Sequence, residues 1–326
     1  MELGSIDFRL STLDCRLRAD MSSHLRLMTE ADIPAGMRLK ELAGWNQTSS
    51  DWERFLRASP SGCFVAELDG RVCGTATTIV YEERFAWIGM VLVDPECRGR
   101  GIGTRLLARA IEHLDAVGVP TLKLDATPQG KPIYAKSGFV SEYDIERWTL
   151  ERRTDLAGAG VSVAPGERAA AGAAEPSASL PSASLPFTSK PDVEGIAEFD
   201  RDVFGADRGG LLMSLHNETT SFTLEAKNRG KLQGYALGRR GARADHLGPW
   251  IARDESSARG LLVEFLHRSK RETIFVDCVK LNRFACGLVE SLGFEFSRPL
   301  TRMYRGPNRH PGRPEFVCGI LGPEFG

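Results

Sequence analysis

The chain has 326 residues, of which 42% are hydrophobic and 26% are charged, and its formal net charge is −1 at pH 7. This length allows two domains of ordinary soluble composition. The near-neutral charge gives no basic surface, so we expect no nucleic-acid partner.

Seven cysteines are scattered along the chain without a Cys-x-x-Cys pair, which argues against a zinc site and a disulfide framework. We therefore expect no metal and a reducing, cytoplasmic setting. No apolar run reaches the ~18 residues of a membrane-spanning helix, and the N-terminus lacks the basic-then-apolar plan of a signal peptide. The chain is thus expected to have no membrane partner.

Residues 1–23 show no sustained hydrophobic period and are expected to be an N-terminal extension. A short strand is expected over Leu25–Met28. Thr29–Asp32 can cap the helix that follows, which carries apolar side chains over Ile33–Leu42 and ends at Gly44.

Residues 45–52 place two tryptophans and several hydrogen-bonding side chains in a loop that enters a second helix near Phe55. Aromatic and amide groups together suit a small amine ligand. Packing of both tryptophans in the core, with Thr48 or Ser50 only capping the helix, explains the pattern equally well. The candidate substrate-binding residues are Trp45, Asn46, Gln47 and Trp52.

The next elements are expected to be strands. Cys63–Leu68 and Val72–Tyr81 form a hairpin, because Asp69-Gly70 between them favours a type I′ turn. Trp87–Val93 is apolar throughout and stops at Asp94-Pro95, as in a strand that is buried on both faces.

A glycine-rich loop follows this strand and leads into an amphipathic helix that starts at Ile102 and stops at Gly118. Three glycines are expected to adopt positive φ and to point consecutive amides at an anion, near the positive end of the helix dipole. Two arginines add charge, so the loop predicts a phosphate site. The glycines are Gly99, Gly101 and Gly103, and the arginines are Arg98 and Arg100.

Two common phosphate loops do not fit this spacing. A dinucleotide-binding Gly-x-Gly-x-x-Gly would need glycine at 104 or 106, where Thr104 and Leu106 stand. A Walker loop needs Gly-Lys-Ser/Thr, but Gly130-Lys131 is followed by Pro132.

The pattern Arg-x-x-Gly-x-Gly, filled by Arg98, Gly101 and Gly103, resembles the pyrophosphate loop of the GNAT superfamily of N-acetyltransferases. A strand at Thr121–Asp125 follows, then Pro132–Phe139, which is similar to the Leu-Tyr-x-x-x-Gly-Phe helix of that family. A last strand is expected over residues 140–150. The resemblance covers about residues 24–150 and implies an α/β (α+β) fold with a mixed twisted sheet flanked by helices.

This resemblance implies acetyl-CoA as co-substrate and a set of site residues. Backbone amides of the buried strand would polarise the thioester carbonyl, and Tyr134 stands at the position of the general acid. Glu82, Glu83 and Asp125 are the nearest carboxylates by fold reasoning, but no motif selects one, so the base stays unassigned. The cofactor-binding residues implied are Met90, Val91, Leu92, Val93, Arg98, Gly99, Arg100, Gly101, Ile102, Gly103 and Thr104.

The second half of the chain echoes the first. A linker rich in alanine, glycine, proline and serine, residues 154–188, separates a catalytic domain, 24–153, from a second domain, 189–326. That domain repeats a helix at Val193–Phe204, a hairpin, a buried strand and a Gly-Phe pair. It is similar to a duplicated, degenerate GNAT domain, so the chain resembles a tandem GNAT protein.

The second copy differs where chemistry would occur. Arg253–Ala258 replaces the glycine loop, and Asp254 can cap the helix itself and repel a diphosphate. Val289 aligns with Tyr134. The Gly248-Pro249-Trp250 segment is expected to be a packing turn. We expect this domain not to bind acetyl-CoA productively.

The function implied is acetyl transfer from acetyl-CoA to the amine of a small molecule, by direct attack on the thioester. Two alternatives stay open: a protein-lysine acetyltransferase, and a non-catalytic acyl-CoA sensor. Tyr134 argues against the sensor. The acceptor, the acyl-chain preference and the choice between monomer and homodimer are not determined by the sequence.

Overall fold

The computed structural model describes residues 23–152 and 191–326. Most of the expected N-terminal extension and the whole expected linker lie outside these residues, so the proposed domain boundaries stay a prediction. These residues form two compact units, one made of the described residues up to Ile79 with Ile88–Gly118 and the other of Val80–Trp87 with the described residues from Val119 to Gly326. Within the part of the chain that is described, no helix has the length and apolarity needed to cross a bilayer.

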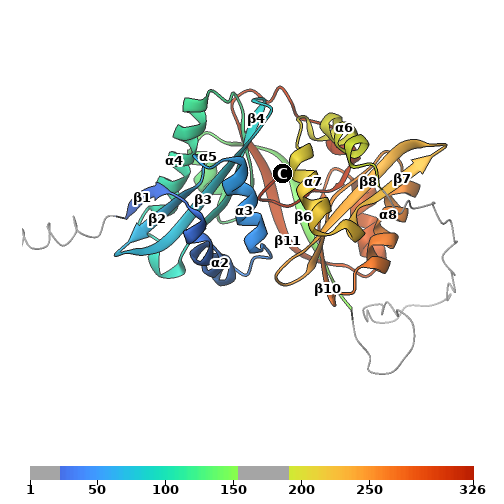
Figure 1. Ribbon diagram of the computed structural model, residues 1–326, viewed down its shortest axis with the longest axis horizontal. Coiled ribbons are helices and arrows are strands. Elements are labelled where there is room, and N and C mark those ends of the chain that lie inside the picture. The colour runs from blue at the N-terminus through green and yellow to red at the C-terminus, as the bar shows by residue number, and fades with distance from the viewer. Residues whose placement is uncertain (1–22, 153–190) are drawn as a thin grey trace, which may run out of the picture. The chain divides into compact units, whose positions relative to one another are not determined.

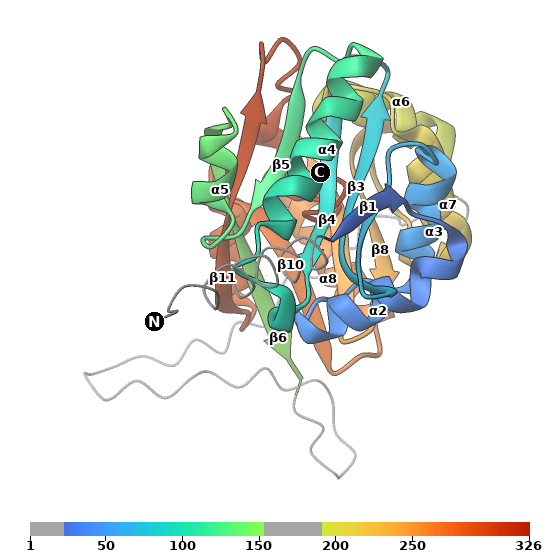
Figure 2. The same cartoon turned by 90° about the vertical axis from the view of Figure 1, so that its left-hand side faces the viewer.

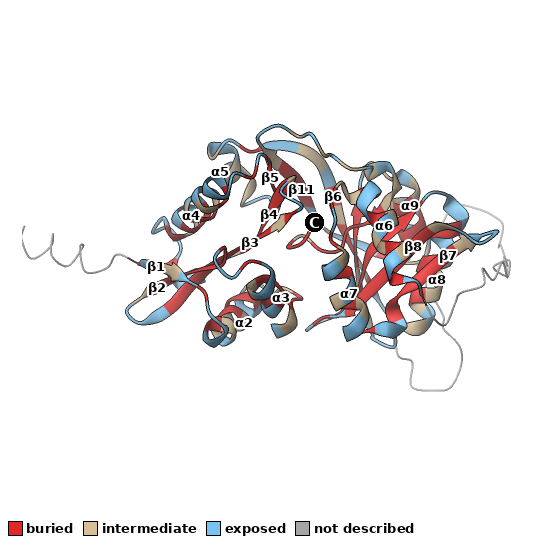
Figure 3. Ribbon diagram, turned by 45° about the horizontal axis from the view of Figure 1, so that its top comes forward, coloured by how far each residue is buried: buried red, intermediate tan, exposed pale blue. Residues whose placement is uncertain are grey.

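The first unit is a small sheet with helices on both faces (Figures 1 and 3). Its strands lie in the order β1-β2-β3-β4, and β3 and β4 both continue into the second unit. Helix α4 covers one face, and helices α2 and α3 cover the other. The elements are β1 (His24–Leu27), α2 (Ile33–Leu42), α3 (Ser49–Ala58), β2 (Phe64–Leu68), β3 (Arg71–Tyr81), β4 (Phe85–Val93) and α4 (Ile102–Val117).

The expected hairpin and helix ends of the first unit are confirmed. Asp69 and Gly70 have φ of 52° and 74°, as a type I′ turn requires. Gly118 ends α4 in the left-handed region, where its amide donates to the oxygen of Leu114 at 3.1 Å. A Cβ at Gly74 would lie 2.8 Å from Leu106, so this glycine lets α4 pack closely on β3.

The second unit contains the C-terminal end of β3, the N-terminal end of β4 and the elements from β5 onward. Its strands lie in the order β4-β5-β11-β6-β10-β12-β9-β8-β7, and β10 also pairs with β9. The elements are β5 (Leu122–Ala126), α5 (Lys131–Lys136), β6 (Val140–Glu151), α6 (Val193–Phe204), α7 (Gly209–Glu218), β7 (Leu224–Asn228), β8 (Lys231–Arg240), β9 (Asp245–Ala252), α8 (Glu255–Arg268), β10 (Thr273–Val279), α9 (Arg283–Ser291), β11 (Glu295–Arg305) and β12 (Val317–Gly319).

The two sequence halves exchange strands inside this unit. Strand β11, from the C-terminal half, lies antiparallel between β5 and β6 of the N-terminal half (Figure 2). Strand β6 in turn pairs along Thr273–Val279 with β10. Each half of the sequence therefore completes the sheet of the other.

The buried strand expected in the second half, over Leu247–Ala252, is confirmed as part of β9. The Gly248-Pro249-Trp250 segment, expected to be a turn, lies within this strand. A Cβ at position 248 would lie 2.0 Å from the oxygen of Ile320, so glycine is needed there for the close approach of a neighbouring segment. Helix α7 and strands β10 and β12 were not foreseen from the sequence.

Candidate functional site

Strand β4 contains a strained residue in its buried part. Met90 has φ of 50° although it is not glycine, and its side chain is only 2% exposed. A non-glycine residue in this region costs about 1–3 kcal/mol, and such strain gathers at functional sites. The Thr75 hydroxyl donates to the oxygen of Met90 at 2.7 Å and holds the distorted backbone in place. Sequence reasoning missed Thr75, because nothing in its neighbourhood marks a contact with β4.

The strand end is fixed by Asp94. Its Oδ1 accepts from the amide of Glu96 at 3.1 Å, and its Oδ2 accepts from Arg38 at 2.6 Å. Burial acts to raise the pKa of Asp94, but these hydrogen bonds and the charges of Arg38 and Arg71 outweigh it, so the pKa lies below its ordinary value. The start of the glycine loop is thus held by an ionised carboxylate.

The glycine loop adopts the predicted conformation at two of its three glycines. Gly99 and Gly101 have φ of 76° and 75°, and no atom lies within 4 Å of a Cβ built on either one. The prediction of positive φ is wrong for Gly103, which lies inside α4 and does not have positive φ. A Cβ there would lie 3.4 Å from Val93, an ordinary van der Waals distance, so neither the φ nor this contact requires glycine.

The N-terminus of α4 offers unsatisfied donors. Helical hydrogen bonding begins with the amide of Arg105, which donates to Gly101 at 3.0 Å, so the amides of residues 102–104 have no partner within the helix. Gly101 is the N-cap and has no side chain to occupy them. Arg98, Arg100 and Thr104 are exposed, and they lie within or next to this segment of the sequence. The donors, the free space over the glycines and the two arginines fit a diphosphate.

The other implied residues of this strand and loop are less accessible. Leu92 and Ile102 are buried at 6% and 3% exposure. Val91 and Val93 are half-buried in β4. Any contact that these four residues make with a cofactor would therefore come mainly from the backbone.

The equivalent helix in the second half is capped by its own side chain. Asp254 is the N-cap of α8, and its Oδ1 accepts from the amide of Ser257 at 2.8 Å. Its Oδ2 accepts from the Ser257 hydroxyl at 3.0 Å. The cap predicted from the sequence is confirmed, and it places a carboxylate where α4 has Gly101.

Tyr134 lies in the short helix α5 and is half-buried. Its ring meets the edge of Phe139 at 6.2 Å between centroids, and a Cβ at Gly130 would lie 2.8 Å from the ring. Burial raises the pKa of Tyr134 to about 12, so the phenol is protonated at neutral pH.

The backbone supports the alignment of Tyr134 with Val289. The amide of Phe139 donates to Tyr134 at 3.2 Å, and that of Phe294 donates to Val289 at 3.1 Å. The intervening glycines have φ of 85° and 86°. The two segments therefore have the same local geometry, and the second one carries a fully buried valine in place of the phenol.

The expected substrate-binding residues differ in exposure. Trp52 is fully buried and packs against Gly36, where a Cβ would lie 2.9 Å from the indole. Gln47 and Asn46 are buried, whereas Trp45 is half-buried. Thr48 is the N-cap of α3, and its amide donates to Asp51 at 2.8 Å. The capping role considered for Thr48 is therefore confirmed.

Three polar atoms on this side of the first unit have no partner among the described residues. They are Gln47 Oε1, Trp52 Nε1 and the hydroxyl of Thr77, and each lies in a side chain that is at most 5% exposed. Buried polar groups are normally hydrogen-bonded. These atoms are therefore candidates to bind a polar ligand or ordered water.

Two of the three carboxylates considered as bases are bound by other groups. Asp125 accepts two hydrogen bonds from Arg302, each 2.9 Å long. Glu82 accepts from Arg201 and from the amide of Asp207 at 2.8 Å, and its pKa is lowered chiefly by Arg201. Glu83 is exposed at φ of 56°. The base stays unassigned.

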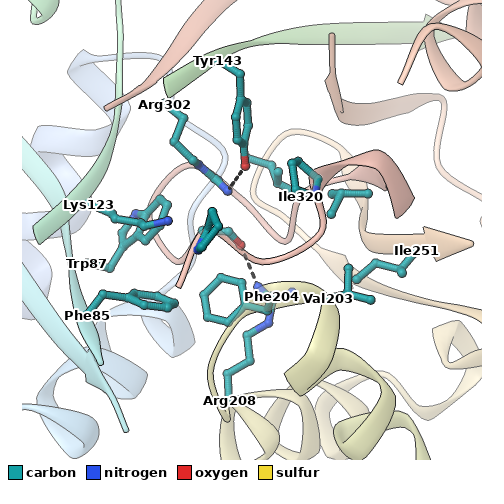
Figure 4. Close-up of a pocket in the computed structure, with 14 residues that line it drawn as sticks. Phe85, Trp87, Lys123, Tyr143, Val203, Phe204, Arg208, Ile251, Arg302 and Ile320 are labelled. Atoms are coloured by element: carbon teal, nitrogen blue, oxygen red, sulfur yellow. Dashed lines mark hydrogen bonds between the residues drawn. The ribbon is translucent and has the colours of Figure 1, made fainter. Parts of the chain in front are cut away.

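A pocket in the second unit has charged and aromatic walls but little room (Figure 4). Its volume is about 20 Å³, which holds about one water molecule. Arg302 donates to the Tyr143 hydroxyl at 2.7 Å, and Arg208 donates to the oxygen of Gly326 at 2.7 Å. The space between these side chains is therefore small, and two of its arginines are held by hydrogen bonds. Within residues 23–152 and 191–326, no three metal-binding side chains lie close enough to hold an ion.

Two family models match the chain in separate segments. The Acetyltransferase (GNAT) family matches residues 30–139, and an Acetyltransferase (GNAT) domain matches residues 196–318. The holothin acyltransferase of Pseudoalteromonas sp. (strain SANK 73390) is 23% identical over 264 residues, which cover 80% of this chain and 81% of that protein.

Solved structures show the same fold. A Pyrococcus horikoshii protein assigned as an acetyltransferase superposes with a TM-score of 0.72 at 22% identity, covering 100% of this chain and 99% of that one. A tandem GNAT protein from the clavulanic acid biosynthesis pathway superposes with a TM-score of 0.60 at 18% identity, covering 88% and 100%. The chain therefore belongs to the GNAT acetyltransferases, a family of enzymes that use acetyl-CoA, and it carries two GNAT domains in tandem.

Proposed function

We propose that this protein transfers an acetyl group from acetyl-CoA to the amine of a small molecule, by direct attack of the amine on the thioester. The first GNAT copy would carry the reaction, and the second would not bind acetyl-CoA productively. The observation that carries this proposal is the difference between the two helix N-termini. Free amides follow Gly101 at α4, whereas Asp254 occupies the corresponding donors at α8.

The residues of the first copy would share the binding of the co-substrate. Amides 102–104 and the side chains of Arg98 and Arg100 would hold the diphosphate, because donors at a helix N-terminus favour anions. The strained backbone at Met90, with Val91, Leu92 and Val93, would present amides to the thioester carbonyl as charge develops on its oxygen.

Tyr134 would act as the general acid. A thiolate leaves when the amine displaces it, and a protonated phenol can return a proton to that sulfur. The raised pKa of Tyr134 keeps the proton available over the physiological range. Among the residues named for the acceptor, Trp45, Asn46, Gln47 and Trp52, the half-buried Trp45 would be the most accessible to it.

The test is thiol release from acetyl-CoA by the full-length protein in the presence of a panel of small amines, together with calorimetric titration of CoA. We expect amine-dependent thiol release and one CoA bound per chain. The Arg98→Gln, Arg100→Gln double variant should weaken CoA binding at least tenfold while unfolding at an unchanged temperature. Two bound CoA molecules per chain, or binding that ignores both arginines, would contradict the proposal.

A further inference from the structure

Strand β11 carries a half-buried arginine that has no partner among the residues described. Arg298 forms no hydrogen bond and no ion pair with any residue in 23–152 or 191–326, although it reaches solvent over part of its surface. Half-buried arginines are normally paired, because removing a guanidinium from water is unfavourable. An unpaired arginine at such a position is therefore a candidate to bind an anionic ligand.

The sheet register places a second arginine directly beside it. Arg298 lies opposite Arg147 of β6, so their side chains share one face of the sheet. Phe296 and Trp148 meet on the opposite face, at 6.1 Å between ring centroids, which fixes this orientation. Two like charges at directly opposed positions repel each other.

The neighbouring carboxylate is already used. Asp277 binds Arg147 with both oxygens, at 2.8 and 2.6 Å, and its Oδ2 lies 3.5 Å from the His246 ring. Asp277 therefore forms its direct pair with Arg147 and leaves Arg298 without a hydrogen-bonded carboxylate. Burial and the charge of Arg147 lower the pKa of Arg298 to about 10, so it still carries its charge at neutral pH.

Two carboxylates act on Arg298 through their charge, and both are already paired with other arginines. Asp277 binds Arg147, and Glu324 binds Arg239. An anionic ligand would give Arg298 the direct partner that these carboxylates do not supply.

We propose that Arg298, backed by Arg147, binds a carboxylate or phosphate group of a small ligand. A planar guanidinium offers such groups two parallel hydrogen bonds, and a half-buried position strengthens them. The group comes either from the acceptor amine, in which case the inference rests on the proposed function, or from a separate small anion.

The first test measures anion binding without catalysis. The full-length protein is unfolded thermally with added inorganic phosphate or succinate, at constant ionic strength. We expect both anions to raise the unfolding temperature of the wild type and of Arg283→Gln, an exposed arginine on α9, but not of Arg298→Gln. Equal shifts in wild type and Arg298→Gln would overturn the proposal.

Thermal unfolding of the same variants without added anion distinguishes a structural role of Arg298 from a binding role. If Arg298 is a binding residue, Arg298→Gln removes a half-buried charge without a direct partner and should unfold at the wild-type temperature or above it. Arg298→Lys should keep part of the anion-induced shift. An Arg298→Gln protein that unfolds well below the wild type in the absence of anions would contradict the proposal.

The second test identifies the source of the anion. Acetylation is measured on paired amines, an amino acid and its carboxamide. If the acceptor supplies the anion, wild type should prefer the acid at least tenfold in kcat/KM, and Arg298→Gln should abolish the preference. An unchanged ratio, together with a lost phosphate shift, assigns the site to a separate anion. Failure of every amine to react would count against the proposed function alone, because the thermal test is independent of it.

Discussion

Tyr134 and Val289 occupy matching backbone positions, and only one of them can move a proton. We expect Tyr134→Phe to lower kcat by about 10²-fold or more, the usual effect of losing a general acid, with little change in the KM for acetyl-CoA. Tyr304→Phe, which removes a hydroxyl from β11, is the matched control. Steady-state kinetics of both variants would test this. An unchanged kcat in Tyr134→Phe would contradict the assignment of Tyr134 as the general acid.

The pKa of Tyr134 gives a prediction about pH. Because burial raises this pKa to about 12, the phenol keeps its proton up to strongly alkaline solution. We expect no loss of kcat from this residue between pH 7 and pH 10. An alkaline decline below pH 10 that disappears in Tyr134→Phe would show that the phenol ionises earlier than its burial implies.

Asp277 controls acid stability. Burial acts to raise its pKa, but the charge and hydrogen bonds of Arg147 outweigh it and hold the pKa at about 2, below the unfolded value. The contribution of Asp277 to the free energy of unfolding is therefore present above about pH 4 and is lost as the pH falls toward 2. Asp277→Asn should destabilise the protein by about 3 kcal/mol at pH 7, since it leaves a buried Arg147 unpaired. Denaturant unfolding between pH 2 and pH 7 would test this. The free energy of unfolding of the variant should fall less steeply with decreasing pH than that of the wild type.

At the scale of single elements, the start of α4 separates the two GNAT copies. Gly101→Asp would place a carboxylate beside the free amides at the start of α4, where it would repel a diphosphate. We expect acetyl-CoA affinity to fall at least tenfold. The free energy of unfolding should fall by about 1–2 kcal/mol, because position 101 has φ of 75°, which strains a residue with a Cβ even where space is free. Gly101→Ala is the control for the left-handed φ, and calorimetric titration with thermal unfolding would compare the two variants.

Elements with a local signal could be predicted from the sequence. The 69–70 turn, the ends of α4 and the cap of α8 each depend on a few adjacent residues. Gly103 shows the limit of this reasoning, because it lies inside α4 without positive φ, although Gly99 and Gly101 close by have positive φ. The requirement for glycine at 248 comes from Ile320, which is distant in sequence.

At the scale of the whole molecule, the exchange of β6 and β11 makes the two halves interdependent. A fragment ending at residue 152 would leave β5 and β6 without β11 between them, and a fragment starting at 191 would lack β6 beside β10. Unpaired strand edges expose donors and acceptors and favour aggregation. We expect each fragment alone to misfold, and the two co-expressed fragments to form a stable complex.

Co-purification and circular dichroism of the fragments would test this exchange. The control is the full-length chain cleaved within 154–188 after folding, which should keep its secondary structure and its thiol-release activity. Independent, cooperative unfolding of the fragment that ends at residue 152 would contradict the interdependence.

The sequence by itself determined the family, the tandem plan, the glycine loop before α4 and the cap that distinguishes the second copy, because each of these depends on neighbouring residues. The pairing of β11 between β5 and β6, the clamp of Arg38 on Asp94 and the opposition of Arg298 to Arg147 were decided by tertiary structure alone. They join residues that are 56 or more positions apart, and no local period or propensity encodes which distant strand or side chain will become a neighbour.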